Sequence, residues 1–193
     1  MKTVLVTGAS DGIGRETARQ ISEKRHQVFI HGRSLEKAAK TAADLAQTVP
    51  DARLIPVYAD LSDMHQVLDL AKQVRDKTAV LDVLINNAGV FEERRTVTRD
   101  GFEMTMAVNH FAHFLLSLQL LDLLKAAPQG RIITVSSIAH GMGTIDLNDL
   151  TFKHHYSGYD AYAVSKLANI LFTMALGARL TGTPVTANSL HPG

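Results

Sequence analysis

The sequence lacks cysteine and tryptophan altogether, and neither sign of charge predominates in it. The absence of cysteine excludes disulfides, cysteine nucleophiles, thiolate-bound iron–sulfur clusters and cysteine zinc sites. Lys and Arg together number 20 and Asp and Glu number 19, which leaves a net charge of +1 on 193 residues. Such a balance provides no broad basic face, so we do not expect nucleic acid as a partner.

Long hydrophobic runs and targeting signals are also missing. The longest nearly apolar stretch, residues 111–121, is too short to span a bilayer. The first seven residues read as a strand rather than as a leader with a cleavage site. We therefore expect a cytoplasmic protein with no membrane anchor. The length and the 46% hydrophobic content predict a single domain over residues 1–193.

Short aliphatic runs alternate with longer amphipathic stretches along the chain. The runs are apolar on both faces, which is typical of parallel strands covered on both sides. This alternation predicts a doubly wound, Rossmann-like α/β sheet with helices on both faces. The predicted strands are 3–6, 28–30, 54–58, 83–85, 132–135 and 185–188, and the predicted helices are 14–24, 35–47, 64–77, 101–125 and 159–181.

Local signals refine this outline. Ser34 and Ser62 each precede a predicted helix and suit its N-cap. Residues 139–159 interrupt the alternation with three glycines, two acidic residues and an adjacent pair of histidines. Loops of this length are often functional, so we expect the segment to lie beside the active site.

The segment Thr7-Gly8-Ala9-Ser10-Asp11-Gly12-Ile13-Gly14 joins the first strand to the first helix. Its glycines allow a tight turn and a close approach of the backbone to a pyrophosphate. The helix N-terminus then offers free N–H groups and a partial positive charge. An ordinary strand-to-helix turn is the alternative, but the position in the first strand–helix unit favours a dinucleotide site.

The end of the second strand indicates which dinucleotide is bound. Sites for NAD usually carry Asp or Glu about 20 residues beyond the glycine-rich loop, bound to the ribose 2′-OH. Here Gly32 and Arg33 take that place, and a guanidinium group suits a 2′-phosphate. We therefore predict NADP(H), with a solvated surface arginine as the alternative. Asp11, inside the glycine-rich loop, counts against phosphate binding.

Polar side chains also follow the next three strands, whose carboxyl ends should meet at the ligand-binding edge of the sheet. Asp60, before Leu61, either bonds the adenine amino group or caps a helix. The motif Asn86–Gly89 either ties neighbouring loops together or forms a turn. Ser136 and Ser137 close the fifth strand, where a hydroxyl either bonds a substrate oxygen or caps the strand end.

Tyr162 and Lys166 lie at positions i and i+4 of a predicted helix and so share one face. A neighbouring ammonium group stabilises a phenolate, so the pair suits general acid/base catalysis. The pattern is weak evidence in isolation, because Tyr-x-x-x-Lys is common by chance. His110 and His113 also share a helix face, but no third ligand is spaced to join them. We interpret them as packed helix residues and predict no metal site.

Together these motifs resemble the classical short-chain dehydrogenase/reductase family. The glycine-rich loop, Asn-Asn-Ala-Gly, the strand-end serines, Tyr-x-x-x-Lys and the closing His191-Pro192-Gly193 occur in the family's order. Residues 14–18, 108–116, 135–140 and 165–169 resemble the retinol-dehydrogenase-like branch. The wide spacing between Ser137 and Tyr162 departs from compact members of the family but resembles an insertion in that branch.

The resemblance implies hydride transfer between NADP(H) and a carbonyl or alcohol. Tyr162 would donate a proton to the substrate oxygen, while Lys166 would stabilise the phenolate and hold the nicotinamide ribose. Ser137 would polarise the carbonyl, and Asn109 would support a proton-relay water. The cofactor is expected to contact Gly8, Ser10, Gly12, Ile13, Gly14, Arg33, Asp60, Leu61, Asn87, Ala88, Gly89, Tyr162, Lys166, Pro192 and Gly193.

Family members continue beyond the last motif with a substrate-covering loop, further helices and a last strand. We therefore expect the domain to be truncated before its substrate-covering region. A small, lipophilic aldehyde or ketone substrate and a homodimer or homotetramer are further expectations carried over from the family. Three alternatives stay open: a non-catalytic dinucleotide-binding regulatory protein, an NAD(H)-dependent dehydrogenase, and a sugar-nucleotide epimerase or dehydratase. The last group shares Tyr-x-x-x-Lys but is fitted less well by this glycine spacing.

Overall fold

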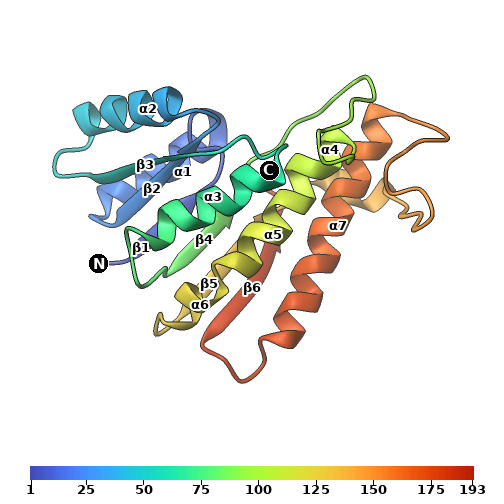
Figure 1. The fold of residues 1–193 in the computed structure, drawn as a ribbon. Coiled ribbons are helices and arrows are strands. Elements are labelled where there is room, and N and C mark those ends of the chain that lie inside the picture. The colour runs from blue at the N-terminus through green and yellow to red at the C-terminus, as the bar shows by residue number, and fades with distance from the viewer.

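The computed structural model describes all 193 residues, which form a six-stranded, wholly parallel sheet flanked by helices (Figure 1). The strand order is β3-β2-β1-β4-β5-β6, so the topological switch point lies between β1 and β4. The strands are β1 (Thr3–Val6), β2 (Gln27–Gly32), β3 (Arg53–Tyr58), β4 (Val83–Asn86), β5 (Gly130–Val135) and β6 (Val185–Leu190). The helices are α1 (Gly12–Glu23), α2 (Leu35–Thr48), α3 (Met64–Arg75), α4 (Met104–Met106), α5 (Ala112–Gln119), α6 (Leu121–Lys125) and α7 (Gly158–Arg179).

All six predicted strands are confirmed, and five of them are longer than predicted. The side chains of β1 and β2 are buried almost throughout, because both strands lie inside the sheet and are covered on both faces. The predicted N-cap of α2 is also confirmed, since the Ser34 hydroxyl accepts a hydrogen bond from the Lys37 amide at 3.3 Å. The Rossmann-like fold class is therefore correct.

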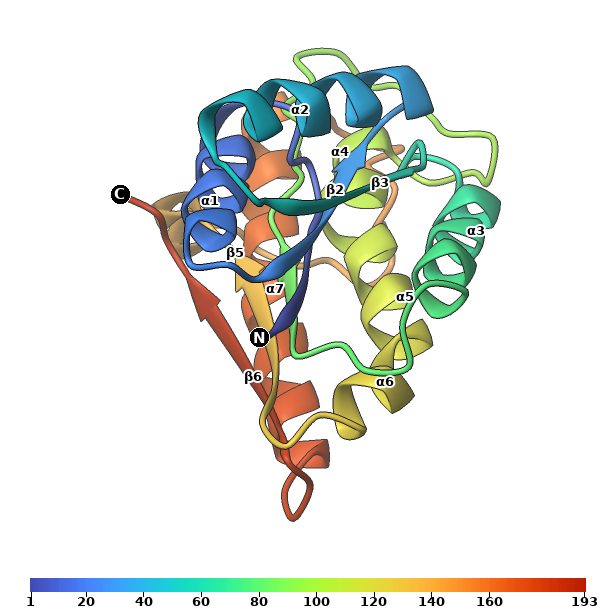
Figure 2. The same cartoon turned by 90° about the vertical axis from the view of Figure 1, so that its left-hand side faces the viewer.

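Two helical layers cover the sheet (Figures 1 and 2). The larger core cluster joins the strands to α3, α5, α6 and α7, and a smaller cluster joins β1 and β2 to α1 and α2. Arg131 of β5 is exposed, and so are the alternate residues Thr186, Asn188 and Leu190 of β6. The layer formed by α1 and α2 therefore covers the β1–β3 half of the sheet rather than its whole width.

The predicted continuous helix over 101–125 is wrong. Gly101 has a φ of 84°, and the helix begins only at Met104, where the buried Glu103 carboxylate caps the first turn. A π-helical turn, η1 (Ala107–Phe111), then separates α4 from α5, and a break at Leu120 separates α5 from α6. A π-turn inside a helix often marks a functional site.

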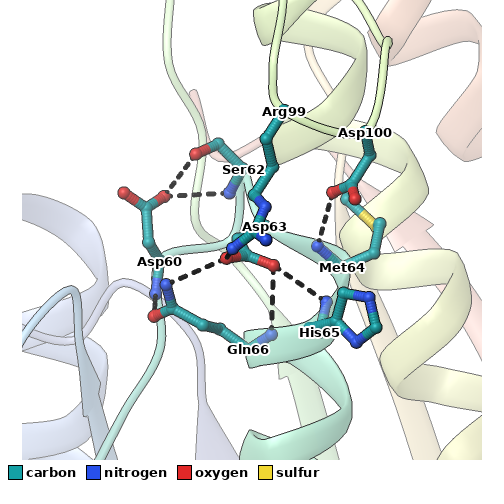
Figure 3. Close-up of polar contacts among 8 residues, drawn as sticks. All are labelled: Asp60, Ser62, Asp63, Met64, His65, Gln66, Arg99 and Asp100. Carbon is teal, nitrogen blue, oxygen red and sulfur yellow. Dashed lines mark hydrogen bonds and ion pairs between the residues drawn. The ribbon is translucent and has the colours of Figure 1, made fainter.

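The predicted N-cap of α3 is also wrong, because Asp63 rather than Ser62 occupies that position (Figure 3). The Asp63 carboxylate accepts hydrogen bonds from the amides of His65 at 3.0 Å and Gln66 at 3.4 Å. The Ser62 hydroxyl donates instead to Asp60 at 2.7 Å. With its hydroxyl already engaged and one residue too early, Ser62 does not cap the helix.

The longest helix, α7, is long and apolar enough to cross a membrane by length and composition alone. No contiguous apolar run in the sequence predicted this property of α7. Its apolar window is 56% buried inside the protein, against η1, η2 (Ile138–Met142) and the last two strands. A core helix satisfies the same composition test, so one helix of this kind is weak evidence for a membrane span.

Candidate active site

The glycine-rich loop between β1 and α1 adopts a conformation that requires its glycines. Gly8 and Gly12 have φ values of 63° and 50°, in the left-handed region. A Cβ atom on Gly14 would lie 2.2 Å from the Gly8 carbonyl oxygen and 2.4 Å from Nδ2 of Asn87. The turn is therefore too tight for a side chain at position 14, which brings the start of α1 against the loop.

The start of α1 presents backbone N–H groups to the loop side. Asp11 is the N-cap residue, but its side chain makes no capping hydrogen bond. The first-turn amides of residues 12–14 have no partner within the helix. Together with the positive end of the helix dipole, these amides suit a pyrophosphate. The Asp11 carboxylate is exposed and lines the cavity that opens beside the loop, where its negative charge opposes this attraction.

A cavity of about 580 Å³ opens beside the loop at the carboxyl edge of the sheet. It is the cavity that would take the adenosine half of a dinucleotide. It brings together eleven of the predicted cofactor residues, and its seven other lining residues include two polar side chains outside the sequence motifs, His31 and Lys37. Those eleven are Gly8, Ser10, Gly12, Ile13, Gly14, Arg33, Asp60, Leu61, Asn87, Ala88 and Gly89.

The chemistry of this cavity fits a phosphorylated ribose. The Ser10 hydroxyl is buried without a hydrogen-bond partner, and a Cβ built on Gly32 would lie 2.7 Å from it. Arg33 and Lys37 supply two cationic side chains. A ribose hydroxyl or a phosphate would supply the partner that Ser10 lacks, so the residues present fit a dinucleotide.

The same cavity holds one feature that the sequence did not indicate. The Nε atom of Arg33 lies 3.4 Å from a carboxylate oxygen of Asp60, and the Arg33 side chain is 65% exposed. The other Asp60 oxygen accepts from the amide and hydroxyl of Ser62 (Figure 3). Asp60 is therefore neither a helix cap nor free of partners, and it partly neutralises Arg33.

A second cavity, of about 490 Å³, shares four lining residues with the first: Ile13, Asn87, Gly89 and Val90. The glycine-rich loop and the predicted catalytic residues therefore border one continuous region at the edge of the sheet. The structure brings five of the remaining predicted residues to this second cavity: Ser137, Tyr162, Lys166, Pro192 and Gly193. The 3₁₀ turn η2 (Ile138–Met142), which follows Ser137 directly, packs against α7, but no residue of the excursion 139–159 lines this cavity.

Lys166 is a buried cation held beside Tyr162. Its side chain is 4% exposed, and Nζ donates a hydrogen bond to the Val135 carbonyl at 3.0 Å. Nζ also lies 5.4 Å from the centroid of the Tyr162 ring. Burial lowers the pKa of Lys166 to about 8, so the amine is poised to lose its proton in mildly alkaline solution.

The two strand-end serines have different surroundings. Ser136 is 4% exposed, and its hydroxyl donates to the Lys166 carbonyl at 2.8 Å, which ties β5 to α7. The Ser137 hydroxyl accepts from the Ala139 amide at 3.3 Å and keeps its proton free to donate. The Ser137 carbonyl also accepts from Nδ1 of His140 at 2.7 Å. Ser137 is therefore the serine available to a substrate.

Asn109 lies in the π-turn, outside both cavities and fully buried. Its side chain pairs with the Val90 backbone, accepting from the amide at 2.7 Å and donating to the carbonyl at 3.0 Å. Its backbone carbonyl accepts from Nδ2 of Asn169 and Nδ1 of His113. Asn109 thus fixes the segment after β4 and already has partners for its polar groups.

The Asn86–Gly89 motif and the buried His113 tie the loops at this edge together. Asn87 Nδ2 donates to the Thr7 carbonyl at 2.8 Å, as expected for a residue that links neighbouring loops. Burial lowers the pKa of His113 to about 3, so its ring is neutral. Since Nδ1 donates to Asn109, Nε2 accepts from the Thr7 hydroxyl at 3.0 Å. The ring therefore connects the glycine-rich loop to the π-turn.

Known proteins are similar in sequence to this chain over its whole length. A family model described as short chain dehydrogenase matches residues 2–193. Retinol dehydrogenase 13 of Homo sapiens is 42% identical over 193 residues, which cover 100% of this chain and 58% of that protein. Retinol dehydrogenase 11 of Homo sapiens is 43% identical over 192 residues, which cover 100% of this chain and 60% of that protein. The chain thus spans about 60% of the length of the curated relatives it matches.

Solved structures share the fold. A crystal structure of an uncharacterized protein from Mycobacterium paratuberculosis has a TM-score of 0.88 and 39% identity, and the match covers 100% of this chain and 68% of that one. The RhlG/NADP active-site complex from Pseudomonas aeruginosa has a TM-score of 0.80 and 30% identity, covering 100% of this chain and 72% of that one. The chain belongs to the short-chain dehydrogenase/reductase family of nicotinamide-dinucleotide-dependent oxidoreductases, and within it to the retinol-dehydrogenase-like branch.

Proposed function

We propose that this chain is the dinucleotide-binding and catalytic part of an NADP(H)-dependent carbonyl reductase or alcohol dehydrogenase, with Tyr162 as the general acid/base. The observation that carries the proposal is the convergence of Ser137, Tyr162 and Lys166 on one cavity that adjoins the glycine-rich loop. A protein that only binds a dinucleotide has no need of a buried ammonium group beside a phenol. Burial of Lys166 is costly, which favours a catalytic role for it.

Each residue has a defined task in this proposal. The Tyr162 hydroxyl gives its proton to the substrate oxygen during reduction and takes it back during oxidation. The Lys166 ammonium stabilises the phenolate that remains, and the Ser137 hydroxyl donates a hydrogen bond to the same substrate oxygen. When bound, the nicotinamide ring supplies or accepts the hydride. Pro192 and Gly193 line the cavity where that ring would lie.

The preference for NADP(H) rests on charge at the end of β2. No carboxylate occupies the position after Gly32, and Arg33 and Lys37 both line the adenosine cavity with the unpartnered Ser10 hydroxyl. These groups suit the two charges of a 2′-phosphate. The second candidate is an NAD(H)-dependent dehydrogenase. The ion pair between Arg33 and Asp60 favours it, because it occupies part of the guanidinium group.

The substrate that we propose is a lipophilic aldehyde, ketone or alcohol. Phe91 lines the catalytic cavity, is 50% exposed, and packs edge-on against the Tyr162 ring with the centroids 5.8 Å apart. Ile138 and Met142, on the 3₁₀ turn after Ser137, are 75% and 63% exposed. Phe91 beside Tyr162, and the exposed apolar side chains on the turn that follows Ser137, are suited to contact an apolar substrate. Several relatives are named retinol dehydrogenases, which agrees with such a substrate.

We also propose that the protein self-associates through an apolar groove between α5 and α7. The groove has a volume of about 500 Å³, and twelve of its fourteen lining residues are hydrophobic. Phe114 and Leu171 lie in the groove and are 43% and 48% exposed. In a two-fold dimer, α5 and α7 of a second copy would pack on α5 and α7 of the first and cover these side chains.

Replacing Tyr162 with Phe tests the catalytic assignment. The substitution removes only the hydroxyl, so NADPH binding should stay within about threefold of wild type. Turnover of a carbonyl panel should fall by a factor on the order of 10³. Tyr159→Phe is the matched control, because Tyr159 lies in the first turn of the same helix and does not line the cavity. Loss of NADPH binding in Tyr162→Phe, or full turnover by it, would contradict the assigned role.

A further inference from the structure

His31, near the end of β2, is buried within the cofactor region but takes no part in the predicted chemistry. It is 3% exposed, follows the apolar residues 28–30 of β2, and lines the adenosine cavity. A buried imidazole at such a position needs partners for both nitrogens. Its partners are the Gly8 amide, which lies 3.0 Å from Nδ1, and the Ala59 carbonyl, which lies 3.2 Å from Nε2.

These two contacts define a single state of the ring. The Gly8 amide can only donate, so Nδ1 must carry a lone pair. The Ala59 carbonyl can only accept, so Nε2 must carry the proton. Burial lowers the pKa of His31 to about 4, in agreement with a neutral ring at neutral pH. The contact geometry therefore requires the neutral tautomer protonated on Nε2.

The ring joins two backbone segments that both line the cavity. Gly8 belongs to the glycine-rich loop, and Ala59 precedes Asp60 and Leu61 at the end of β3. The backbone carbonyl of His31 also accepts from the Ala9 amide at 2.9 Å, so this one residue holds two consecutive loop amides. No other side-chain hydrogen bond in the structure connects the glycine-rich loop to the segment after β3.

We propose that His31 is a positioning residue of the cofactor site, whose neutral imidazole holds the glycine-rich loop and the end of β3 at the separation that the adenosine half of the dinucleotide requires. The inference rests on the proposed cofactor site but concerns a residue outside the family's motifs. Its effect is confined to the adenosine half, because Tyr162 and Lys166 border the other cavity.

The test compares three substitutions in the purified protein by calorimetric titration with NADPH and with 2′,5′-ADP, which represents the adenosine half alone. His31→Leu removes both contacts. His31→Asn keeps an acceptor near the Nδ1 position, and His31→Gln keeps a donor near the Nε2 position. His65→Leu is the matched control, because His65 is exposed on α3. The melting temperature of each variant without ligand is measured alongside.

We expect His31→Leu to weaken both ligands by about tenfold, the effect of one lost buried hydrogen bond. We expect His31→Asn and His31→Gln to recover part of that loss, and kcat at saturating NADPH to stay unchanged. Wild-type Kd values in His31→Leu with a lowered melting temperature would overturn the inference, because His31 would then be only structural. Equal weakening in the control His65→Leu would also overturn it, since the loss would then not be specific to the bridge.

A second measurement separates this inference from the proposed function. Nitrogen-15 NMR of the imidazole without cofactor should show the neutral tautomer protonated on Nε2 with Nδ1 accepting a hydrogen bond. A ring protonated on Nδ1 would overturn the inference whether or not NADPH binds. If wild-type protein binds neither ligand, both the cofactor proposal and the role of His31 fail. If it binds both ligands and His31→Leu does not differ, only the role of His31 fails.

Discussion

At the scale of single residues, the site depends on a lysine that is costly to bury. The Lys166 side chain donates one hydrogen bond, to the Val135 carbonyl, and no carboxylate neutralises it. Its pKa is lowered to about 8 by burial, whereas lysine in water has a pKa of about 10.4. The protein therefore keeps a cation beside the Tyr162 ring at neutral pH and loses it in mild alkali.

This state of Lys166 predicts the alkaline side of the pH profile. Carbonyl reduction needs the protonated amine beside Tyr162, so kcat should fall as the pH rises through about 8. In Lys166→Arg the guanidinium stays charged throughout this range, so residual activity should lose that alkaline decline. The measurement is kcat against pH between 6 and 10 at saturating NADPH. The same decline in Lys166→Arg would show that another group causes it.

At the scale of elements, the N-cap residue of α3 could not be predicted from the local sequence. Ser62 and Asp63 are adjacent, and both residue types are good N-caps, so local sequence could not choose between them. The Asp63 carboxylate also pairs with Arg99, a distant residue, at 2.9 Å (Figure 3). Which of the two residues caps α3 therefore depends on a tertiary contact that the local sequence does not indicate.

The corrected cap gives a stability prediction. Asp63→Ala removes the acceptor for two first-turn amides of α3 and should lower the melting temperature by about 3 °C. Ser62→Ala is the matched control and should change it by less than about 1 °C, because its hydroxyl bonds only to Asp60. Thermal denaturation followed by circular dichroism measures both. A larger loss of melting temperature in Ser62→Ala than in Asp63→Ala would show that Ser62 is the N-cap residue.

How far the sequence predicts the elements depends on the range of the interactions that form them. The strands follow from their own apolar runs, and the glycine-rich loop follows from its spacing. The π-turn at Asn109 does not, because it depends on contacts with Val90 and Ser165, which are distant in sequence. His31 and Lys37 were missed as cavity residues for the same reason, since neither belongs to a local motif.

At the scale of the whole molecule, the two helical layers border different parts of the proposed site. The layer of α1 and α2 borders the adenosine cavity, while α7 carries Tyr162 and Lys166 and forms one wall of the apolar groove. Burial of the groove in a second copy of the chain would therefore also support the helix that carries the acid/base pair. This links assembly to the active site through a single element.

The proposed assembly is tested by light scattering. At micromolar concentration the wild-type protein should have at least twice the mass of one chain. Phe114→Glu and Leu171→Glu place a carboxylate in the apolar groove and should shift the protein to a monomer. Leu68→Glu is the matched control, because Leu68 is exposed on α3 outside the groove. A monomeric wild-type protein, or variants that assemble normally, would contradict the proposal.

Side-by-side calorimetric titration with NADPH and NADH is the sharpest test of whether the site prefers NADP(H). We predict that wild-type protein binds NADPH at least about tenfold more tightly than NADH, as a charge-assisted phosphate contact implies. Arg33→Ala should abolish this difference, whereas Arg53→Ala, at an exposed position on β3, should preserve it. Equal or tighter binding of NADH by the wild-type protein would contradict the account and would make Arg33 a surface residue paired with Asp60.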